Sequence, residues 1–262
     1  MGRFKLLKGK ENNMVLLFSG SAHGNELANY IYNNNIDGTV CVSSQFNKMI
    51  LPEDTNNFKV IVDKMSSRKI ADFIVKNRVD KVIDATMPYE VRESKVIDEG
   101  VFLAREENCN VSLICIDDER EEIEDAVYFD TYEEISNYLN TKHGNIMLTV
   151  GNNDVEKFAG INNFSGRIYA RMVMINSMVN SLEQKGFVKE HFIFDKGVFD
   201  ADQNIQMIRR YNIKYFVTKD TGAEGGLAQK AAAAKRTHIE LIILRRPVIK
   251  DGVDVATAIQ MI

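Results

Sequence analysis

The chain has 262 residues, enough for one large domain or two small ones, and either arrangement can bury an adequate core. Lysine and arginine number 33 against 37 aspartates and glutamates, a formal net charge of −4. The composition therefore gives no support to binding of nucleic acid or of a membrane surface as the main activity. No apolar run approaches the ~20 residues that span a bilayer. The basic N-terminus, 1–13, lacks the apolar core of a signal peptide, and we expect a cytoplasmic protein.

The first half of the chain alternates apolar, strand-like runs with helical patterns. This alternation predicts a parallel, doubly wound sheet, because each crossover between parallel strands needs a helix. The expected strands are Met14–Phe18, Gly38–Val42, Val60–Val62, Lys81–Ile83, Val111–Ile116 and Val127–Phe129. The expected helices are Glu26–Tyr32, Ser66–Asn77, Glu90–Asn108 and Tyr132–Asn140.

The same pattern starts again at Asn145. The expected strands are Ile146–Val150, Arg167–Ile175, Phe192–Phe194, Ile213–Val217 and Ile239–Leu244, and the expected helices are Val155–Phe158, Ser177–Lys185, Ala201–Tyr211 and Leu227–Lys235. We therefore place a boundary near Thr141–Gly144 and predict an α/β protein with two Rossmann-like domains, 1–143 and 144–262. Their parallel sheets are expected to face a central cleft, where ligands commonly bind. Residues 1–13 read as an extension outside the first domain.

A glycine loop follows the first strand. Gly20 and Gly24 lack side chains, so backbone amides at a helix start could approach a pyrophosphate there, and Ser21 adds a hydroxyl donor. His23 could contact phosphate or ribose, or could simply be an exposed loop residue. The spacing is G-x-x-x-G, not G-x-G-x-x-G, so a plain tight turn between strand and helix fits equally well.

Two further segments are expected near this glycine loop, at the carboxyl edge of the first sheet. Ser43 and Ser44 end the second strand where an NAD-binding protein carries an acidic residue for the ribose 2′-hydroxyl, so the choice between NADPH and NADH stays open. After the fourth strand, Ala85, Thr86 and Pro88 could form a wall against a nicotinamide ring. The alternative is an ordinary helix start with proline near the first turn.

The second half carries an anion-binding pattern in VTKDTGAEGG, which lies between a strand and an alanine-rich helix. Lys219 could meet an anionic ligand, whereas Asp220 or Thr221 could instead cap the helix that follows. Gly222 keeps the turn free of side-chain bulk. Other candidates for binding an anion are Lys196 and Gly197 in an earlier loop and Arg246 after the last strand, where Arg245-Arg246 could hold carboxylates or remain solvated.

Two other patterns do not support a site. Tyr138 and Lys142 have the spacing of the tyrosine and lysine of short-chain dehydrogenases. They lie on a polar surface helix without the upstream serine or glycine pattern, so we interpret the spacing as accidental. Residues of metal-ligating type are scattered, and no metal site is expected from Cys41, Cys109, Cys115, His23, His143, His191 and His238.

In this order, the motifs resemble the precorrin-6A reductase family of cobalamin biosynthesis, including its cobalt-precorrin-6A branch. The segments that carry the resemblance are Ser19–Gly24, Asp84–Tyr89, Thr149–Phe158, Thr218–Ala223 and Arg245–Pro247. Three residues depart from the family pattern: Ser19 replaces a glycine, His23 an acidic residue and Met87 a histidine. No role of that histidine can therefore be transferred to this chain.

The resemblance implies that NADPH or NADH delivers hydride to a double bond of (cobalt-)precorrin-6A, giving (cobalt-)precorrin-6B. The first domain would hold the cofactor, and the second would bind the carboxylates of the tetrapyrrole through Lys196, Lys219 and Arg246. Lys219, Tyr89 and water are the candidate proton donors. Other enzymes of the pathway are further candidate partners, whereas nucleic acid, a membrane and a protein-bound metal are not expected.

Two alternatives stay open at this point. One is a different NAD(P)H-dependent reductase of a smaller anionic substrate, which the Lys219 and Arg246 edge also fits. The other is a non-catalytic nucleotide-binding protein, in which Ser19, His23 and Met87 mark a lost activity. The presence of cobalt in the substrate and the oligomeric state cannot be read from the sequence.

Overall fold

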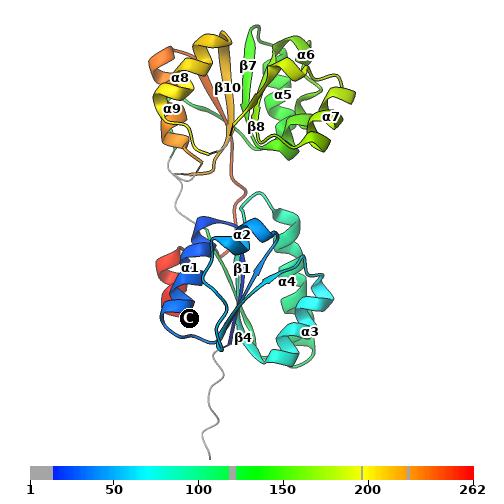
Figure 1. Ribbon diagram of the computed structural model, residues 1–262, viewed down its shortest axis with the longest axis vertical. Helices are drawn as coiled ribbons and strands as arrows, with labels where there is room; N and C mark the ends of the chain where they lie inside the picture. Colours follow the sequence, from blue (N-terminus) through cyan, green and yellow to red (C-terminus); the bar gives the residue numbers. More distant parts are fainter. Residues whose placement is uncertain (1–13, 118–121, 196, 223–224) are drawn as a thin grey trace, which may run out of the picture. The chain divides into compact units, whose positions relative to one another are not determined.

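The computed structural model describes residues 14–117, 122–195, 197–222 and 225–262. The chain divides into two compact units, Met1–Glu119 with Pro247–Ile262 and Arg120–Arg246. Each unit is built around one parallel sheet with helices on both faces (Figure 1). This confirms the predicted α/β class with two Rossmann-like parallel sheets. No helix among the described residues is long and apolar enough to cross a membrane.

The first unit has a five-stranded sheet in the order β3-β2-β1-β4-β5, and every neighbouring pair is parallel. The strands are β1 (Met14–Ser19), β2 (Gly38–Val42), β3 (Phe58–Val62), β4 (Val79–Ala85) and β5 (Ser112–Cys115). The strand order reverses between β1 and β4. In open sheets of this kind, ligands bind beyond the carboxyl ends of the strands near such a reversal.

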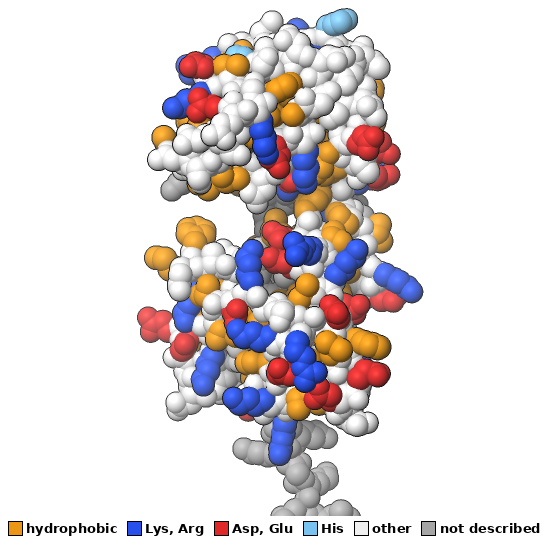
Figure 2. Space-filling model, turned by 90° about the vertical axis from the view of Figure 1, so that its right-hand side faces the viewer, with side chains coloured by type: hydrophobic (Ala, Val, Ile, Leu, Met, Phe, Trp, Pro, Cys, Tyr) orange, Lys and Arg blue, Asp and Glu red, His pale blue; other side chains and the backbone are white. Residues whose placement is uncertain are grey.

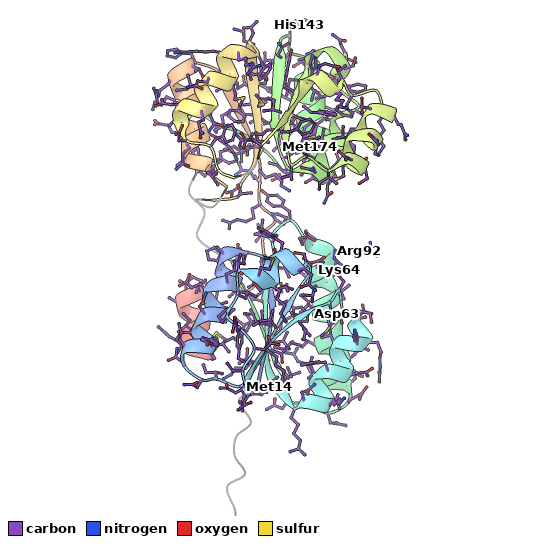
Figure 3. The ribbon with its side chains drawn as sticks, viewed as in Figure 1. Met14, Asp63, Lys64, Arg92, His143 and Met174 are labelled. Atoms are coloured by element: carbon purple, nitrogen blue, oxygen red, sulfur yellow. The ribbon has the colours of Figure 1, made fainter. Side chains whose placement is uncertain are left out.

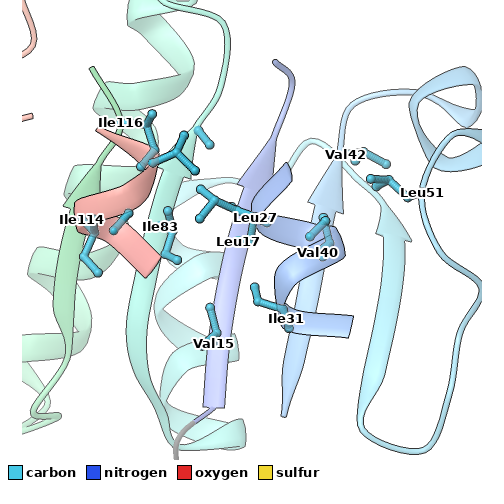
Figure 4. Packing of buried hydrophobic residues seen from close by; sticks show 14 of the residues in the cluster. Val15, Leu17, Leu27, Ile31, Val40, Val42, Leu51, Ile83, Ile114 and Ile116 are labelled. Atoms are coloured by element: carbon cyan, nitrogen blue, oxygen red, sulfur yellow. The ribbon is translucent and has the colours of Figure 1, made fainter. Parts of the chain in front are cut away.

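Side chains of β1 alternate between the two faces of this sheet, as the period of two requires. Val15 and Leu17 pack with α1 (Ala22–Asn33) and α10 (Val255–Met261) in one core, part of which Figure 4 shows. Leu16 and Phe18 pack on the other face with α3 (Ser67–Asn77) and α4 (Val91–Glu106). The short helix α2 (Gln45–Met49) contacts β2 and β3 and has no buried residue.

The second unit has a six-stranded sheet in the order β6-β11-β10-β7-β8-β9, again parallel throughout. The strands are β6 (Val127–Phe129), β7 (Asn145–Thr149), β8 (Ile168–Met172), β9 (Phe192–Phe194), β10 (Ile213–Lys219) and β11 (Glu240–Leu244). Helices α8 (Ala201–Arg210) and α9 (Leu227–Thr237) pack together on one side of the sheet (Figure 1). The remaining helical segments are α5 (Tyr132–Asn140), α6 (Phe164–Arg167), α7 (Asn176–Gln184) and the 3₁₀ turns η1 (Asn152–Phe158) and η2 (Lys189–His191).

The boundary between the units differs from the one predicted near residue 143. Strand β6 pairs with β11, so β6 and the following α5 belong to the second sheet. The C-terminal helix returns to the first unit, where Val255 and Ala258 join the α1 core and Val253 bridges to Ile116. Local periodicity identifies a strand but carries no information about the sheet that it joins, which explains both differences.

Candidate functional site

A cavity of about 600 Å³ opens at the carboxyl edge of the first sheet. Phe18, Ile70 and Ile97 contribute apolar walls from β1, α3 and α4. The ends of β1 to β4 supply most of the remaining lining. The other lining residues are Ser19, Gly20, Cys41, Val42, Ser43, Asn47, Asp63, Lys64, Met65, Ser66, Thr86, Met87, Glu90, Arg92, Glu93 and Val96.

The two glycines of the β1–α1 loop have different roles. Gly20 lines the cavity, and a Cβ at this position would lie 3.5 Å from Thr86 Cα and Met87 N, an ordinary contact. At Gly24 a Cβ would lie 2.5 Å from Ser19 Oγ and 2.9 Å from Ser19 Cα. Gly24 therefore allows α1 to pack closely on β1, whereas Gly20 keeps the cavity wall free of side-chain bulk.

Two of the serines predicted as cofactor contacts, Ser21 and Ser44, cap helices. Ser21 begins α1: its Oγ accepts from Gly24 N at 3.2 Å and donates to the carbonyl of Ala85 at 2.9 Å, so it ties the β1 and β4 loops together. Ser44 caps α2 by accepting from Asn47 N at 3.2 Å. Ser43 does line the cavity, and no acidic residue follows β2.

The β4–α4 loop forms one side of the same cavity. Asp84, buried at the end of β4, accepts from Thr86 N at 3.1 Å and from Thr86 Oγ1 at 2.7 Å, which fixes the loop as it leaves the sheet. Thr86 and Met87 face the cavity. Ala85 is buried, and Pro88, Tyr89 and the half-buried His23 are not among the lining residues.

Sequence reasoning missed a group of charged residues at this cavity. Asp63 and Lys64 follow β3, and Arg92 and Glu93 lie in the first turn of α4. Asp63 is paired with Lys69, and Lys64 Nζ lies 3.4 Å from Glu93 Oε1. Arg92 forms no ion pair within the described part of the chain. The position of Asp63 and Lys64 at the carboxyl end of β3, next to β2, was a signal for these two residues, whereas Arg92 and Glu93 had no comparable signal.

Figures 2 and 3 show where these charges lie. In Figure 3, Asp63, Lys64 and Arg92 lie at one edge of the first sheet, and Met14 marks the opposite edge, where β1 begins. Figure 2 looks onto the face that carries α3 and α4, and shows basic side chains with acidic ones among them at the same edge. The cavity thus combines an apolar interior with a charged rim.

In the second unit, Lys219 ends β10 and is paired within the unit. Its Nζ lies 2.8 Å from Asp154 Oδ2 on η1, and the two side chains are only 18% and 15% exposed. Asp154 also pairs with Lys157 at 2.5 Å. Burial on its own would raise the pKa of Asp154, but the hydrogen bonds from Lys157 and Lys219 lower that pKa below its usual value.

The neighbouring candidates form a second charged contact. Arg246 Nε lies 3.9 Å from Asp220 Oδ2, with side chains 10% and 12% exposed. The helix α9 is capped by Gly226 and not by Asp220 or Thr221, so the capping alternative for these residues is wrong. The structure brings Lys219, Asp220, Thr221, Gly222 and Arg246 together at the carboxyl edge of β10 and β11.

Three positions complete the account of the predicted residues. Gly222 and Gly197 have φ of +59° and +95°, and nothing lies within 4 Å of a Cβ built at either position. Both loops therefore expose backbone. Lys196 lies outside the described residues. Tyr138 donates to Glu240 Oε1 at 2.6 Å at the start of β11, away from the carboxyl edge, and so the Tyr138–Lys142 pair does not join the candidate site.

Two parallel sheets with a cavity beyond the carboxyl ends of the first define an α/β protein of Rossmann type. The sequence profile of the precorrin-6x reductase CbiJ/CobK family matches residues 14–262, and the chain belongs to that family. Its members are oxidoreductases of cobalamin biosynthesis that reduce a carbon–carbon double bond of a tetrapyrrole precursor. The resemblance found in the motifs is thereby confirmed.

Similar proteins agree with this assignment. The chain is 24% identical over 246 residues to a cobalt-precorrin-6A reductase of Priestia megaterium, covering 91% of this chain and 92% of that one. It is 26% identical over 195 residues to a cobalt-precorrin-6A reductase of Methanococcus maripaludis, covering 72% and 73%. A solved CobK precorrin-6A reductase has the same fold, with a TM-score of 0.70 at 14% identity over 95% of this chain and 96% of that one.

Proposed function

We propose that the protein transfers hydride from a reduced nicotinamide cofactor to a double bond of precorrin-6A or its cobalt form, giving the corresponding precorrin-6B. The observation that carries the proposal is the family match over residues 14–262 in a chain whose first sheet has a cavity at its carboxyl edge. When bound, the dihydronicotinamide would supply the hydride. The protein would bind, orient and shield the two reactants.

The cavity fits the adenosine and phosphate part of a dinucleotide. Its apolar walls could receive a base, and Gly20 leaves room for a pyrophosphate close to the backbone. Thr86 and Met87 on the β4 side would extend the site toward the nicotinamide. Ser21 and Gly24 would act indirectly, Ser21 by holding the loops of β1 and β4 together and Gly24 by seating α1 on β1.

The rim of the cavity favours NADPH over NADH. A carboxylate after β2, which would bind a ribose 2′-hydroxyl and repel a 2′-phosphate, is replaced by Ser43. Lys64 and Arg92 contribute positive charge to the same rim. Of the acidic residues there, Asp63 and Glu93 are engaged with lysines, and Glu90 is a third carboxylate at the cavity. Arg92 is therefore the residue that we expect to bind a 2′-phosphate.

The second unit would bind the macrocycle, whose acetate and propionate groups are anionic. Lys219, Arg246 and the exposed backbone at Gly222 and Gly197 lie at the carboxyl edge of its sheet, and Lys196 follows β9 in the sequence. Asp154 and Asp220 hold the two cations in fixed positions, so that little side-chain entropy is lost when a carboxylate arrives. Lys219, Tyr89 and water remain the candidate proton donors.

The test is a spectroscopic assay of the purified full-length chain. Precorrin-6A and cobalt-precorrin-6A are each mixed with NADPH or NADH, and the absorbances of the dihydronicotinamide and the macrocycle are followed together. We expect both to change in equal amounts, faster with NADPH. Cofactor binding without oxidation would instead support a non-catalytic nucleotide-binding protein. If neither macrocycle leads to oxidation of the cofactor, the proposed substrate is rejected.

A further inference from the structure

A buried lysine lies beneath the loop that follows β10. Lys230, on the second turn of α9, is only 4% exposed. Its ammonium donates to Thr218 Oγ1 at 2.9 Å and to the carbonyl oxygen of Gly225 at 2.7 Å. Lysine is among the residues least often buried, because its charge loses hydration. Neither acceptor carries a compensating negative charge.

The charges near Lys230 increase this cost. The pKa of Lys230 is lowered to about 7, first by burial and then by the charge of Arg171 on β8. Arg171 faces the same interior: it donates to Asn204 Oδ1 on α8 at 3.0 Å and stacks 4.2 Å from the Phe199 ring. Burial lowers the pKa of Arg171 as well, and the carboxylate of Asp195 offsets only part of that lowering.

A buried lysine at this position does not stabilise the core more than an apolar side chain would. Replacing buried charged groups by apolar side chains of similar volume is often neutral or stabilising. The same helix packs Leu227, Ala233 and Ala234 into an apolar cluster, where a methionine would be expected to pack well. The two contacts of Lys230 therefore need another explanation: one is to Thr218 near the end of β10, and the other is to Gly225 just before α9.

These contacts join the end of β10 to the start of α9. Thr218 is fully buried and immediately precedes Lys219, whereas Gly225 lies next to the residue that caps α9. Two backbone hydrogen bonds add to these contacts: Gly225 N donates to Thr221 O at 3.3 Å, and Leu227 N donates to Gly222 O at 3.2 Å. A side chain at Gly225 would collide with Thr221 Oγ1, which a Cβ would approach to 1.5 Å.

The geometry points to Lys230 as a positioning residue of the substrate site. Its ammonium ties Thr218 to Gly225, and through Thr218 it positions Lys219 and the backbone of Thr221 and Gly222 for a carboxylate of the macrocycle. This inference rests on the proposed function of the second unit. Lys230 itself does not touch the substrate, because its ammonium is buried and donates to Thr218 and to Gly225.

The test compares Lys230→Met with Lys235→Met in the full-length protein. Lys235 lies on the same helix, its side chain is 74% exposed, and it reaches only Glu124 at 3.8 Å, so it is a matched control. For Lys230→Met we expect the KM for the macrocycle to rise about tenfold, the effect of roughly one lost charge-assisted hydrogen bond. The kcat and the affinity for NADPH should stay unchanged, and the Tm should stay the same or rise. Lys235→Met should change none of these.

A second variant removes the other partner of the same hydrogen bond. Thr218→Val removes the hydroxyl that accepts from Lys230, and should raise the same KM. The double variant should be no worse than the poorer single variant, because Thr218→Val removes a contact that Lys230→Met has already removed. Thr218→Val alone keeps the inference testable if Lys230→Met folds poorly.

Three results would overturn the inference. The first is a macrocycle KM in Lys230→Met equal to that of Lys235→Met. The second is a parallel loss of Tm, kcat and affinity for both ligands, which would indicate a purely structural role. The third is strict additivity of Lys230→Met and Thr218→Val. Wild-type protein that fails to reduce either form of precorrin-6A would instead reject the proposed function, so the two failures are distinguishable.

Discussion

The two sheets share one fold, but their carboxyl edges differ in how their side chains are arranged. In the first unit the edge is open: a cavity of about 600 Å³ lies beyond β1 to β4, with Gly20 at its wall and Arg92 at its rim. In the second unit the polar side chains at the edge bind one another, as in the Lys219–Asp154 pair and the contact of Lys230 with the loop. A dinucleotide can enter a preformed cavity, whereas a carboxylate-rich ring needs fixed charges. The comparison suggests how one architecture, used twice, could serve two ligands.

Loss of Lys219 should have the largest effect, confined to the second ligand. Lys219→Ala is expected to weaken macrocycle binding by roughly 1.5–3 kcal/mol, because a charge-assisted hydrogen bond is lost in a partly buried place. Cofactor affinity should hardly change. Lys157→Ala is the control, since Lys157 also pairs with Asp154 but is 47% exposed. Kinetics with each ligand varied in turn measure both effects. Equal loss of affinity for cofactor and macrocycle in Lys219→Ala would break the division between the two units.

The two glycines of the first edge should separate binding from stability. Gly24→Val should destabilise the protein by about 1–3 kcal/mol, because its Cβ would press on Ser19 at the backbone. Gly20→Val should leave the Tm near the wild-type value, because its Cβ meets only ordinary contacts, but should weaken cofactor binding by filling the cavity wall. Thermal unfolding and cofactor titration of both variants are sufficient. Unchanged cofactor affinity in a folded Gly20→Val protein would place the cofactor elsewhere.

Arg92 should determine the choice of cofactor. Arg92→Ala is expected to raise the Kd for NADPH about tenfold, which corresponds to about 1.4 kcal/mol, and to leave the Kd for NADH unchanged. Lys95→Ala is a suitable control, because Lys95 is exposed on the same helix and is not among the residues that line the cavity. Isothermal calorimetry with both cofactors measures the difference. An equal loss of affinity for NADPH and NADH would show that Arg92 does not recognise the 2′-phosphate.

The smallest expected effect is a pH dependence of stability that arises from Lys230. Its pKa is about 7 in the folded protein and near the ordinary value, 10.5, in the unfolded chain. Between these values the unfolded chain binds more protons, so the free energy of unfolding should rise with pH, by about 1 kcal/mol between pH 7 and 8. Denaturant unfolding of wild type and Lys230→Met at several pH values isolates this contribution. A constant difference between the two proteins over this range would refute it.

Much of the site could not be read from local sequence, for identifiable reasons. Ser21 and Ser44 have the residue type of phosphate contacts but begin helices, and their hydrogen bonds from Gly24 N and Asn47 N identify them as caps. Asp63, Lys64 and Arg92 were not singled out by the sequence. They reach one cavity because β3 and α4 converge on the edge beyond β1 and β2. Lys219 was expected to face a ligand directly, and its partner Asp154 lies 65 residues away in the sequence.

The sequence by itself determined the parts of this protein that depend on short-range order. The alternation of apolar runs and helical patterns specified two parallel α/β sheets, and the motifs from Ser19 to Pro247 specified the family. Tertiary structure alone decided that β6 joins the second sheet and that the C-terminal helix packs against α1, because strand pairing and helix packing join segments distant in sequence. It also decided that Lys230 is buried beneath the β10–α9 loop. Periodicity could not reveal this, since the burial of a charge depends on the three-dimensional neighbours that surround it.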